Sequence, residues 1–241
     1  MQRLFTWFNY LYTGCFPLYR LIYFLYKRWS DRDKIRLIKN HVRKGMSVLD
    51  IGANIGFYTS LLSDLVGESG MVYAFEPDEN NYRRLTQTTR GRKNVLTIQS
   101  ACGEKKGTLY LYQSPDMNVD HQTYDSGESR HKIEVRVLSI DDFLKDKNQH
   151  PGFIKIDVQG YDCFAFHGMI KTVANAPDVL LIGELWPYGL KKAGADTDTY
   201  LNLIRRAGFE IRLFSHHTTD DLSRFEEDKF FYIDFWAVKK G

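Results

Sequence analysis

Short apolar runs alternate with segments of helical periodicity along most of the chain. The runs that predict strands lie at residues 46–51, 71–75, 95–99, 153–158 and 179–182. The segments that predict helices lie at residues 30–42, 58–65, 78–88, 164–173 and 197–207. Strands that alternate with helices favour an α/β fold, in which a mainly parallel sheet is covered on both faces.

Two regions depart from this alternation. Residues 108–112 and 133–137 alternate apolar and polar positions with a period of two, and residues 115–131 between them are polar. We interpret them as an inserted β-hairpin with a long functional loop. The last apolar runs, at 210–214 and 230–238, predict an antiparallel pair of closing strands.

An aromatic segment precedes the first predicted helix. Residues 4–26 are rich in Phe, Tyr, Trp and Leu, and Arg20 is their only charge. Polar residues and Pro17 interrupt the segment. Three interpretations stay open: short helices that pack on the domain or close over its site, a helix at a membrane interface, and, least favoured, a spanning helix. We therefore divide the chain into an N-terminal extension, residues 1–29, and one domain, residues 30–241.

Composition and charge exclude some classes of protein. Hydrophobic residues make up 43% and charged residues 26% of the chain, which argues against disorder. Cys15, Cys102 and Cys163 are far apart, so neither a disulfide framework nor a zinc site is indicated, and we expect a cytoplasmic protein. The net charge is +3 and the basic residues are scattered along the chain, from which we expect no nucleic-acid partner.

The first strand ends in a turn that is typical of a nucleoside site. Asp50 lies at the carboxyl end of the apolar run, and Gly52, Asn54 and Gly56 follow in the turn, where glycine lets the backbone approach a ligand closely. Glu76 ends the second strand, where an acidic residue hydrogen-bonds ribose hydroxyls.

The identity of the turn residues distinguishes between cofactors. An NAD(P)-dependent oxidoreductase needs a Gly-x-Gly-x-x-Gly turn around a pyrophosphate, and the residues from Gly52 to Tyr58 do not match it. S-adenosylmethionine (SAM) carries an ammonium group and no phosphate, so it suits a turn that begins with Asp50. SAM is therefore the expected cofactor, with the oxidoreductase as the alternative.

Two segments resemble a known family. Residues 49–77 look like the SAM-binding half of class I methyltransferases, and residues 153–162 resemble the signature of FkbM-type methyltransferases. That signature usually reads Lys-Ile-Asp-Val-Glu-Gly, and Gln159 replaces its Glu. The resemblance covers residues 46–238. It implies a Rossmann-like fold with a mainly parallel seven-stranded sheet and an antiparallel closing strand, and methylation of hydroxyl groups on sugars, glycolipids or polyketides.

The resemblance also implies roles for single residues. The turn residues that would surround the amino-acid part of SAM are Asp50, Gly52, Asn54 and Gly56. Glu76 would hold the ribose, and the segment with Ala101 and Cys102 would lie beside the adenine. An equally consistent interpretation of Cys102 is a buried small hydrophobic residue.

Asp157 lies at the end of the fourth predicted strand and Glu184 follows the fifth, so both should border one cleft. We expect Asp157 to contact SAM; at the reacting end it could position the acceptor hydroxyl, accept its proton or hold a metal. Gln159 cannot act as a base and is a poorer metal ligand than Glu, so no metal is expected. Four residues are expected to contact the acceptor with Glu184: Gln159, Tyr124, Trp186 and Tyr188. Core packing is the alternative for Trp186.

His121 is the expected general base, because imidazole titrates near neutral pH and Asp120 beside it can orient the ring. The alternative is a solvated loop histidine.

The sequence thus predicts a SAM-dependent O-methyltransferase, with a glycan, glycolipid or other small molecule as acceptor. Peripheral membrane contact through residues 1–27, at the inner face of the membrane, and a homodimer are further expectations. A non-catalytic SAM-binding membrane protein stays open, because Gln159 departs from the signature.

Overall fold

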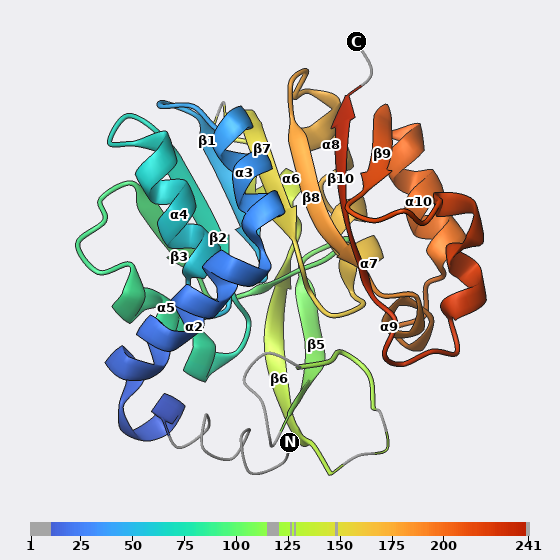
Figure 1. The fold of residues 1–241 in the computed structure, drawn as a ribbon, viewed down its shortest axis with the longest axis horizontal. Coiled ribbons are helices and arrows are strands. Elements are labelled where there is room, and N and C mark those ends of the chain that lie inside the picture. Colours follow the sequence, from blue (N-terminus) through green and yellow to red (C-terminus); the bar gives the residue numbers. More distant parts are fainter. Residues whose placement is uncertain (1–10, 115–120, 126, 128, 148, 240–241) are drawn as a thin grey trace.

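The computed structural model describes residues 11–114, 121–125, 127, 129–147 and 149–239. Its centre is a seven-stranded sheet in the order β3-β2-β1-β7-β8-β10-β9 (Figure 1). The strands are β1 (Ser47–Ile51), β2 (Met71–Phe75), β3 (Val95–Ile98), β7 (Pro151–Ile156), β8 (Leu180–Leu185), β9 (Phe209–Leu213) and β10 (Ile233–Lys239). β10 is antiparallel to both of its neighbours, and the pairings among β1, β2, β3, β7 and β8 are parallel. The predicted fold class is confirmed.

Helices cover both faces of this sheet because its strands are apolar on both sides. The helices on the near face in Figure 1 are α2 (Phe16–Ser30), α3 (Arg32–His41) and α4 (Phe57–Val66). The remaining helices are α5 (Glu79–Thr88), α6 (Ile140–Leu144), α7 (Asp162–His167), α8 (Ile170–Ala174), α9 (Pro187–Lys192), α10 (Thr197–Arg206) and the 3₁₀-helix η1 (Thr219–Phe225). Val48 of β1 packs in the cluster of α3 and α4, whereas Leu49 and Ile51 pack with α6 and α7. Asp50 therefore faces α4, on the side of Val48.

A second, smaller sheet contains the predicted hairpin. Its strands β4 (Ala101–Cys102), β5 (Gly107–Gln113) and β6 (His131–Leu138) lie in the order β4-β6-β5. β5 and β6 pair antiparallel as expected, and β4 adds a parallel edge that the sequence did not indicate. In the long loop, Gln122 pairs with Tyr112.

The described part of the N-terminal extension packs on the domain. Pro17 lies in the first turn of α2, where its missing N–H costs no hydrogen bond, so it begins the helix rather than interrupting it. Ser30 is the last residue of α2 and not the N-cap of the next helix, which begins at Arg32. The Phe24 and Phe57 rings are 5.1 Å apart in an edge-to-face contact. No helix among the described residues is both long enough and apolar enough to cross a membrane.

Candidate functional site

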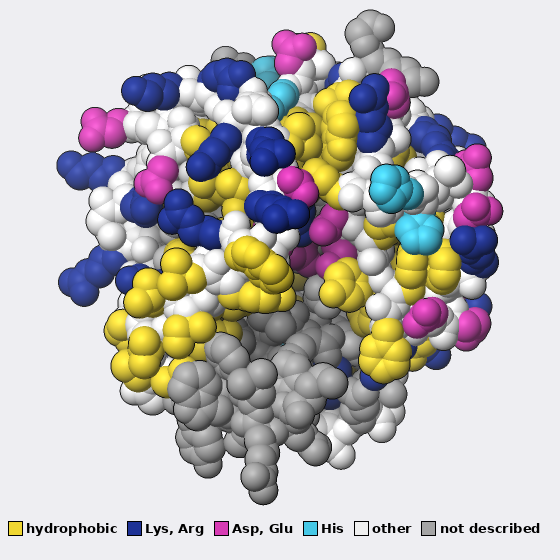
Figure 2. Space-filling view, in the orientation of Figure 1, with side chains coloured by type: hydrophobic (Ala, Val, Ile, Leu, Met, Phe, Trp, Pro, Cys, Tyr) yellow, Lys and Arg dark blue, Asp and Glu magenta, His cyan; other side chains and the backbone are white. Residues whose placement is uncertain are grey.

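A cavity of about 700 Å³ lies at the carboxyl ends of β1, β2, β7 and β8. In the space-filling view, acidic side chains lie in a hollow of this face, and hydrophobic side chains lie around it (Figure 2). Several residues expected at the site line the cavity: Gly52, Asn54, Glu76, Ala101, Cys102, His121, Asp157, Gln159, Glu184 and Trp186. A ligand in this position would lie where open α/β sheets bind theirs.

The turn after β1 requires glycine at one position. Gly52 has a φ of +78°, and a Cβ there would lie 1.9 Å from the carbonyl oxygen of Asp157. The backbone of Gly52 and of Ala53 donates hydrogen bonds to the carbonyl of Phe75. This turn is therefore held against both neighbouring strands. Gly56 does not line the cavity; a Cβ on it would meet Leu85, so it serves the packing of α4 on α5.

Replacing Gly52 by Ala should lower the free energy of unfolding by more than replacing Gly91 by Ala. Both glycines have a positive φ, which costs an alanine about 1–2 kcal/mol, but a Cβ on Gly91 meets nothing within 4 Å. The difference between the two variants in urea denaturation isolates the clash with Asp157. Equal losses would show that the turn can move away from β7.

Glu76 bridges the turns that follow β1 and β2. Its buried carboxylate accepts hydrogen bonds from the backbone N–H of Asn54 at 2.8 Å and of Asp78 at 3.0 Å. Burial raises the pKa of Glu76 to about 8, against the effect of these two hydrogen bonds. Each carboxylate oxygen has two lone pairs, so both retain capacity to accept a hydrogen bond from a ligand hydroxyl.

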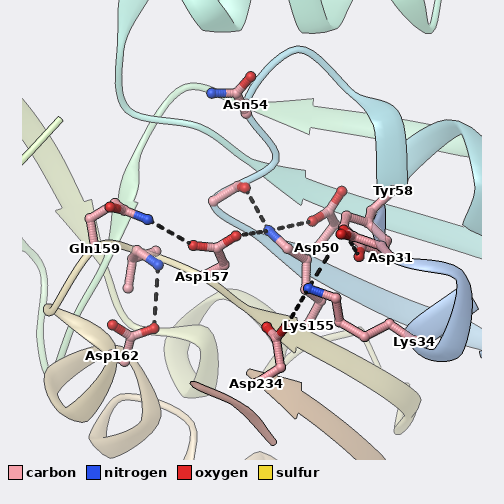
Figure 3. A network of polar contacts seen from close by, with 12 residues as sticks. Asp31, Lys34, Asp50, Asn54, Tyr58, Lys155, Asp157, Gln159, Asp162 and Asp234 are labelled. Carbon is pink, nitrogen blue, oxygen red and sulfur yellow. Dashed lines mark hydrogen bonds and ion pairs between the residues drawn. The ribbon is translucent and has the colours of Figure 1, made fainter. Parts of the chain in front are cut away.

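Lys155 lies between the carboxylates of Asp50 and Asp157, next to the turn that follows β1 (Figure 3). Its Nζ is 3.6 Å from Asp50 Oδ1 and 3.6 Å from Asp157 Oδ2, and it donates to the carbonyl of Gly52 at 2.8 Å. Burial opposes its charge, but Asp157 and Asp50 keep the pKa of Lys155 above its usual value. Burial likewise opposes the charge of Asp157, and Lys155, Lys27 and Lys34 hold its pKa below the usual range.

Asp50 does not reach the cavity, contrary to the direct contact that we expected. It is fully buried beneath the turn, and its Oδ2 accepts a hydrogen bond from Thr59 on α4 at 2.6 Å. The alternation of β1 turns this side chain toward α4, so it acts on the cavity only through Lys155. Strand alternation also offered a signal for Lys155, because it lies in β7 two residues before Asp157 and so on the same side of the extended chain.

A second ion-pair group adjoins the first and comes from both ends of the chain. Lys34 on α3 lies 2.9 Å from Asp234 on β10 and 3.5 Å from Asp31, and Asp31 accepts a hydrogen bond from Tyr58 at 2.5 Å. Lys27 also contacts Asp31, at 2.5 Å. All of these residues line the cavity, and the sequence analysis missed them. Lys27 and Lys34 lie four and three residues from Asp31, a helical spacing, but the contacts of Lys34 with Asp234 and of Tyr58 with Asp31 are long-range, so nothing in the local sequence pattern indicates them.

Glu184 lies at the end of β8, next to this second ion-pair group. It is paired with Asp234 across the antiparallel ladder between β8 and β10. Burial, together with Asp157 and Asp234, raises its pKa well above the usual value. Asp162 on α7 accepts hydrogen bonds from the backbone of Val158 and Gly160, and burial raises its pKa to about 7. The site thus combines an ionised carboxylate, Asp157, with neighbouring carboxyl groups whose pKa values are raised by burial.

His121 borders the cavity but is not placed as the expected base. The backbone N–H of Ser114 donates to its Nδ1 at 3.1 Å, so in the neutral ring the proton lies on Nε2. Nε2 faces Asp78 Oδ1 at 3.8 Å. The lone pair that would accept a substrate proton is therefore engaged with the backbone. Asp120, its expected partner, lies outside the described residues.

The expected acceptor residues are only partly brought together. Trp186 and Gln159 line the cavity, and Gln159 Nε2 donates to Asp157 Oδ1 at 3.1 Å. Tyr188 and Tyr124 do not line it and instead lie against Trp186, with ring centroids 5.8 Å and 6.5 Å away. Their contacts support the Trp186 side chain. Cys102 is buried and burial raises its pKa, so it presents a neutral thiol.

No group of three His, Cys, Asp or Glu residues with the geometry of a metal site occurs in the described parts of the chain. The cavity instead fits a cationic nucleoside. Its size lies within the usual range for small-molecule sites. Glu76 offers acceptors for ribose hydroxyls, and Asp157 complements an ammonium or sulfonium charge.

Comparisons with known proteins agree with this geometry. A model of the Methyltransferase FkbM domain matches residues 50–211. The rRNA 2'-O-methyltransferase fibrillarin of Encephalitozoon cuniculi is 40% identical over 58 residues, which are 24% of this chain and 20% of that protein. The chain thus spans about a fifth of that relative. Ribosomal RNA large subunit methyltransferase E of Acinetobacter baylyi is 26% identical over 189 residues, 70% of this chain and 81% of that protein.

A solved structure from Streptococcus mutans, described as a methyltransferase in complex with S-adenosylhomocysteine (SAH), has the same fold. Its TM-score is 0.53 at 12% identity, over 87% of this chain and 97% of that one.

The expectation that nucleic acid is not a partner is wrong, because curated relatives of this chain are named as rRNA methyltransferases. The oxidoreductase alternative is set aside and SAM is the cofactor. The chain belongs to the FkbM family of methyltransferases.

Proposed function

We propose that this protein transfers the methyl group of SAM to a hydroxyl on a sugar ring. The observation that carries the proposal is the position of Glu184 in the cavity, beside Asp157 and with a raised pKa. A carboxylate with a raised pKa is a stronger base than an ordinary glutamate and is better suited to take the proton of an alcohol during attack. Glu184 thereby takes the role that the sequence analysis assigned to His121.

The remaining residues orient and stabilise the reactants. When bound, SAM would supply an activated methyl group for the acceptor oxygen, with the neutral thioether as leaving group. Asp157 is ionised and positions the acceptor hydroxyl or the cofactor's cationic end. Lys34, whose pKa is raised by Asp234 and Asp31 against the effect of burial, stays protonated and stabilises negative charge that develops on the acceptor oxygen. His121 acts through its Nε2–H as a donor.

Sugar hydroxyls occur in more than one class of acceptor molecule. Trp186 gives the cavity an aromatic wall on which a sugar ring can stack. A ribose hydroxyl of RNA and a hydroxyl of a glycan or glycolipid share this chemistry, and the rRNA methyltransferases among the relatives favour including RNA.

Methyl-labelled SAM tests the proposal directly. The purified protein is incubated with structured RNA, with oligosaccharides and with a glycolipid extract, and the label is followed through ribonuclease and glycosidase digestion. An alkali-stable methyl ether on a sugar supports the proposal, and the digestion identifies its source. Label found only on nitrogen or in a carboxyl ester contradicts it. Bound SAM without any transfer would leave the non-catalytic alternative.

The affinity for SAM should rise with pH between about 6 and 8. Glu76 holds a proton below its pKa of about 8, and hydrogen bonds from ribose hydroxyls favour the ionised carboxylate, so binding releases a proton. Calorimetry in buffers of different ionisation enthalpy measures this proton. Glu76→Gln should bind SAM more weakly and without the pH dependence. An unchanged affinity from pH 6 to 8 in the unsubstituted protein would show that Glu76 does not receive the ribose.

A further inference from the structure

An apolar stripe on α2 faces solvent. Leu18, Leu21, Leu25 and Trp29 recur at intervals of three and four residues, so they lie along one face of the helix. Their exposed fractions are 43%, 57%, 59% and 72%, which are high for large hydrophobic side chains. Figure 2 shows hydrophobic side chains gathered over α2 in this orientation. A patch of this kind on one face marks an interaction surface.

Positive charge is concentrated in the same segment, so the basic residues are less scattered than the sequence analysis held. Residues 16–44 contain nine Lys or Arg and two Asp, a net charge of +7. The other residues contain 24 Lys or Arg and 28 Asp or Glu, a net charge of −4. Arg20, Arg28 and Lys39 line a groove of about 430 Å³ together with Leu21 and Leu25. None of these three cations has an acidic partner in the described chain.

The stripe adjoins the opening of the cavity. Tyr23, Tyr26 and Lys27, on another side of α2, line the cavity that contains Asp157 and Glu184. Phe230 and Tyr232 also line it and are 86% and 63% exposed. Figure 2 places hydrophobic groups on both sides of the acidic hollow. A flat apolar surface that covers α2 would therefore lie next to the cavity.

We propose that the α2 face, defined by Leu18, Leu21, Leu25, Trp29, Arg20, Arg28 and Lys39, docks on an anionic lipid surface. The transfer of leucine and tryptophan side chains into the acyl boundary lowers the free energy, and the cations meet lipid phosphates and carboxylates. RNA would satisfy the cations but would leave the leucines in water. A second copy of the chain would bring like charges of +7 together. The proposal does not depend on the proposed reaction.

Flotation with vesicles tests this surface. The full chain is mixed with phosphatidylcholine vesicles, with or without about a third phosphatidylglycerol, and its partition is measured at low and high salt. We expect binding to the anionic vesicles only, reduced by salt. Quenching of Trp29 fluorescence by brominated lipid, absent in Trp29→Phe, should report its depth.

Matched variants separate the apolar and ionic contributions. Leu25→Gln and Trp29→Ser should each weaken partition about tenfold or more, and Arg28→Gln and Lys39→Gln about fivefold each. The controls are Leu96→Gln, at a site that is 45% exposed on β3, and Lys105→Gln with Lys106→Gln, at exposed sites. These controls should partition like the unsubstituted protein. SAM binding, measured in parallel, should be unchanged in every variant and confirms folding.

The outcomes are distinguishable from one another and from failure of the reaction. Partition that the leucine, tryptophan and charge variants reduce, while the controls do not, supports the proposal whether or not methyl transfer is found. Absence of vesicle binding overturns it. If the protein binds RNA in the absence of vesicles, and only the charge variants weaken this binding, the face is assigned to RNA and the lipid proposal is overturned. Dimerisation in sedimentation that Leu25→Gln abolishes, without vesicle binding, assigns the face to a second copy and overturns it as well.

Discussion

Replacing Glu184 by Gln should lower kcat for methyl transfer by about 10²- to 10⁴-fold, with little change in SAM affinity. Glutamine keeps the size of the side chain but cannot accept the proton of the acceptor hydroxyl. In the unsubstituted protein the base must be ionised, so kcat should fall as the pH decreases through the raised pKa of Glu184. That fall should lie above the ordinary Glu value of about 4.3. Initial rates across pH, with SAM saturating, measure both effects.

His121→Gln is the matched control for this prediction. It should lower kcat less than about tenfold, the effect of a lost donor rather than a lost base, and should keep the acidic fall of the pH profile. If His121→Gln removes that fall and Glu184→Gln does not, the histidine is the base and the assignment to Glu184 is wrong.

Replacing Lys155 by Met should lower the free energy of unfolding by about 3–5 kcal/mol, the usual cost of removing one partner of a buried ion pair. The change leaves the fully buried Asp50 without its counter-charge and the carbonyl of Gly52 without its donor. Asp157 is less affected, because its side chain is 36% exposed. Urea denaturation at pH 7 measures the loss.

The double variant Asp50→Asn with Lys155→Met separates charge from packing. Removing the buried carboxylate that lost its partner should restore part of the stability relative to Lys155→Met alone. If Lys155→Met loses less than about 1 kcal/mol, in the range of exposed pairs, water reaches Asp50 and the buried network does not stabilise the fold.

The parallel strands could be predicted because each is a short apolar run bounded by a turn. The predictions failed where a functional or close-packed residue interrupts the pattern. The run expected at 179–182 continues as β8 to Leu185, past Gly183 and Glu184. The helix expected at 164–173 divides into α7 and α8 at Gly168, where a Cβ would lie 1.9 Å from the carbonyl of Gly103. Helices as short as α6 and α9 hold too few turns to show a period.

The candidate site could be predicted where it depends on strand ends and turns. Gly52, Glu76 and Asp157 follow strands of one sheet and Glu184 lies at the end of another, so topology alone brings them to one edge. The partners of those residues could not be predicted in the same way. Whether a histidine accepts or donates depends on a backbone N–H seven residues away, as it does for His121.

The contact between Lys34 and Asp234 has a practical consequence for work with fragments. Both residues lie outside the segment 50–211 that matches the family, one on each side of it. A recombinant fragment trimmed to that segment would lose both charges and also β10, which separates β8 from β9. Two strand edges would then be uncovered and prone to aggregate. Expression clones and fusion junctions should therefore retain the chain from α3 through β10.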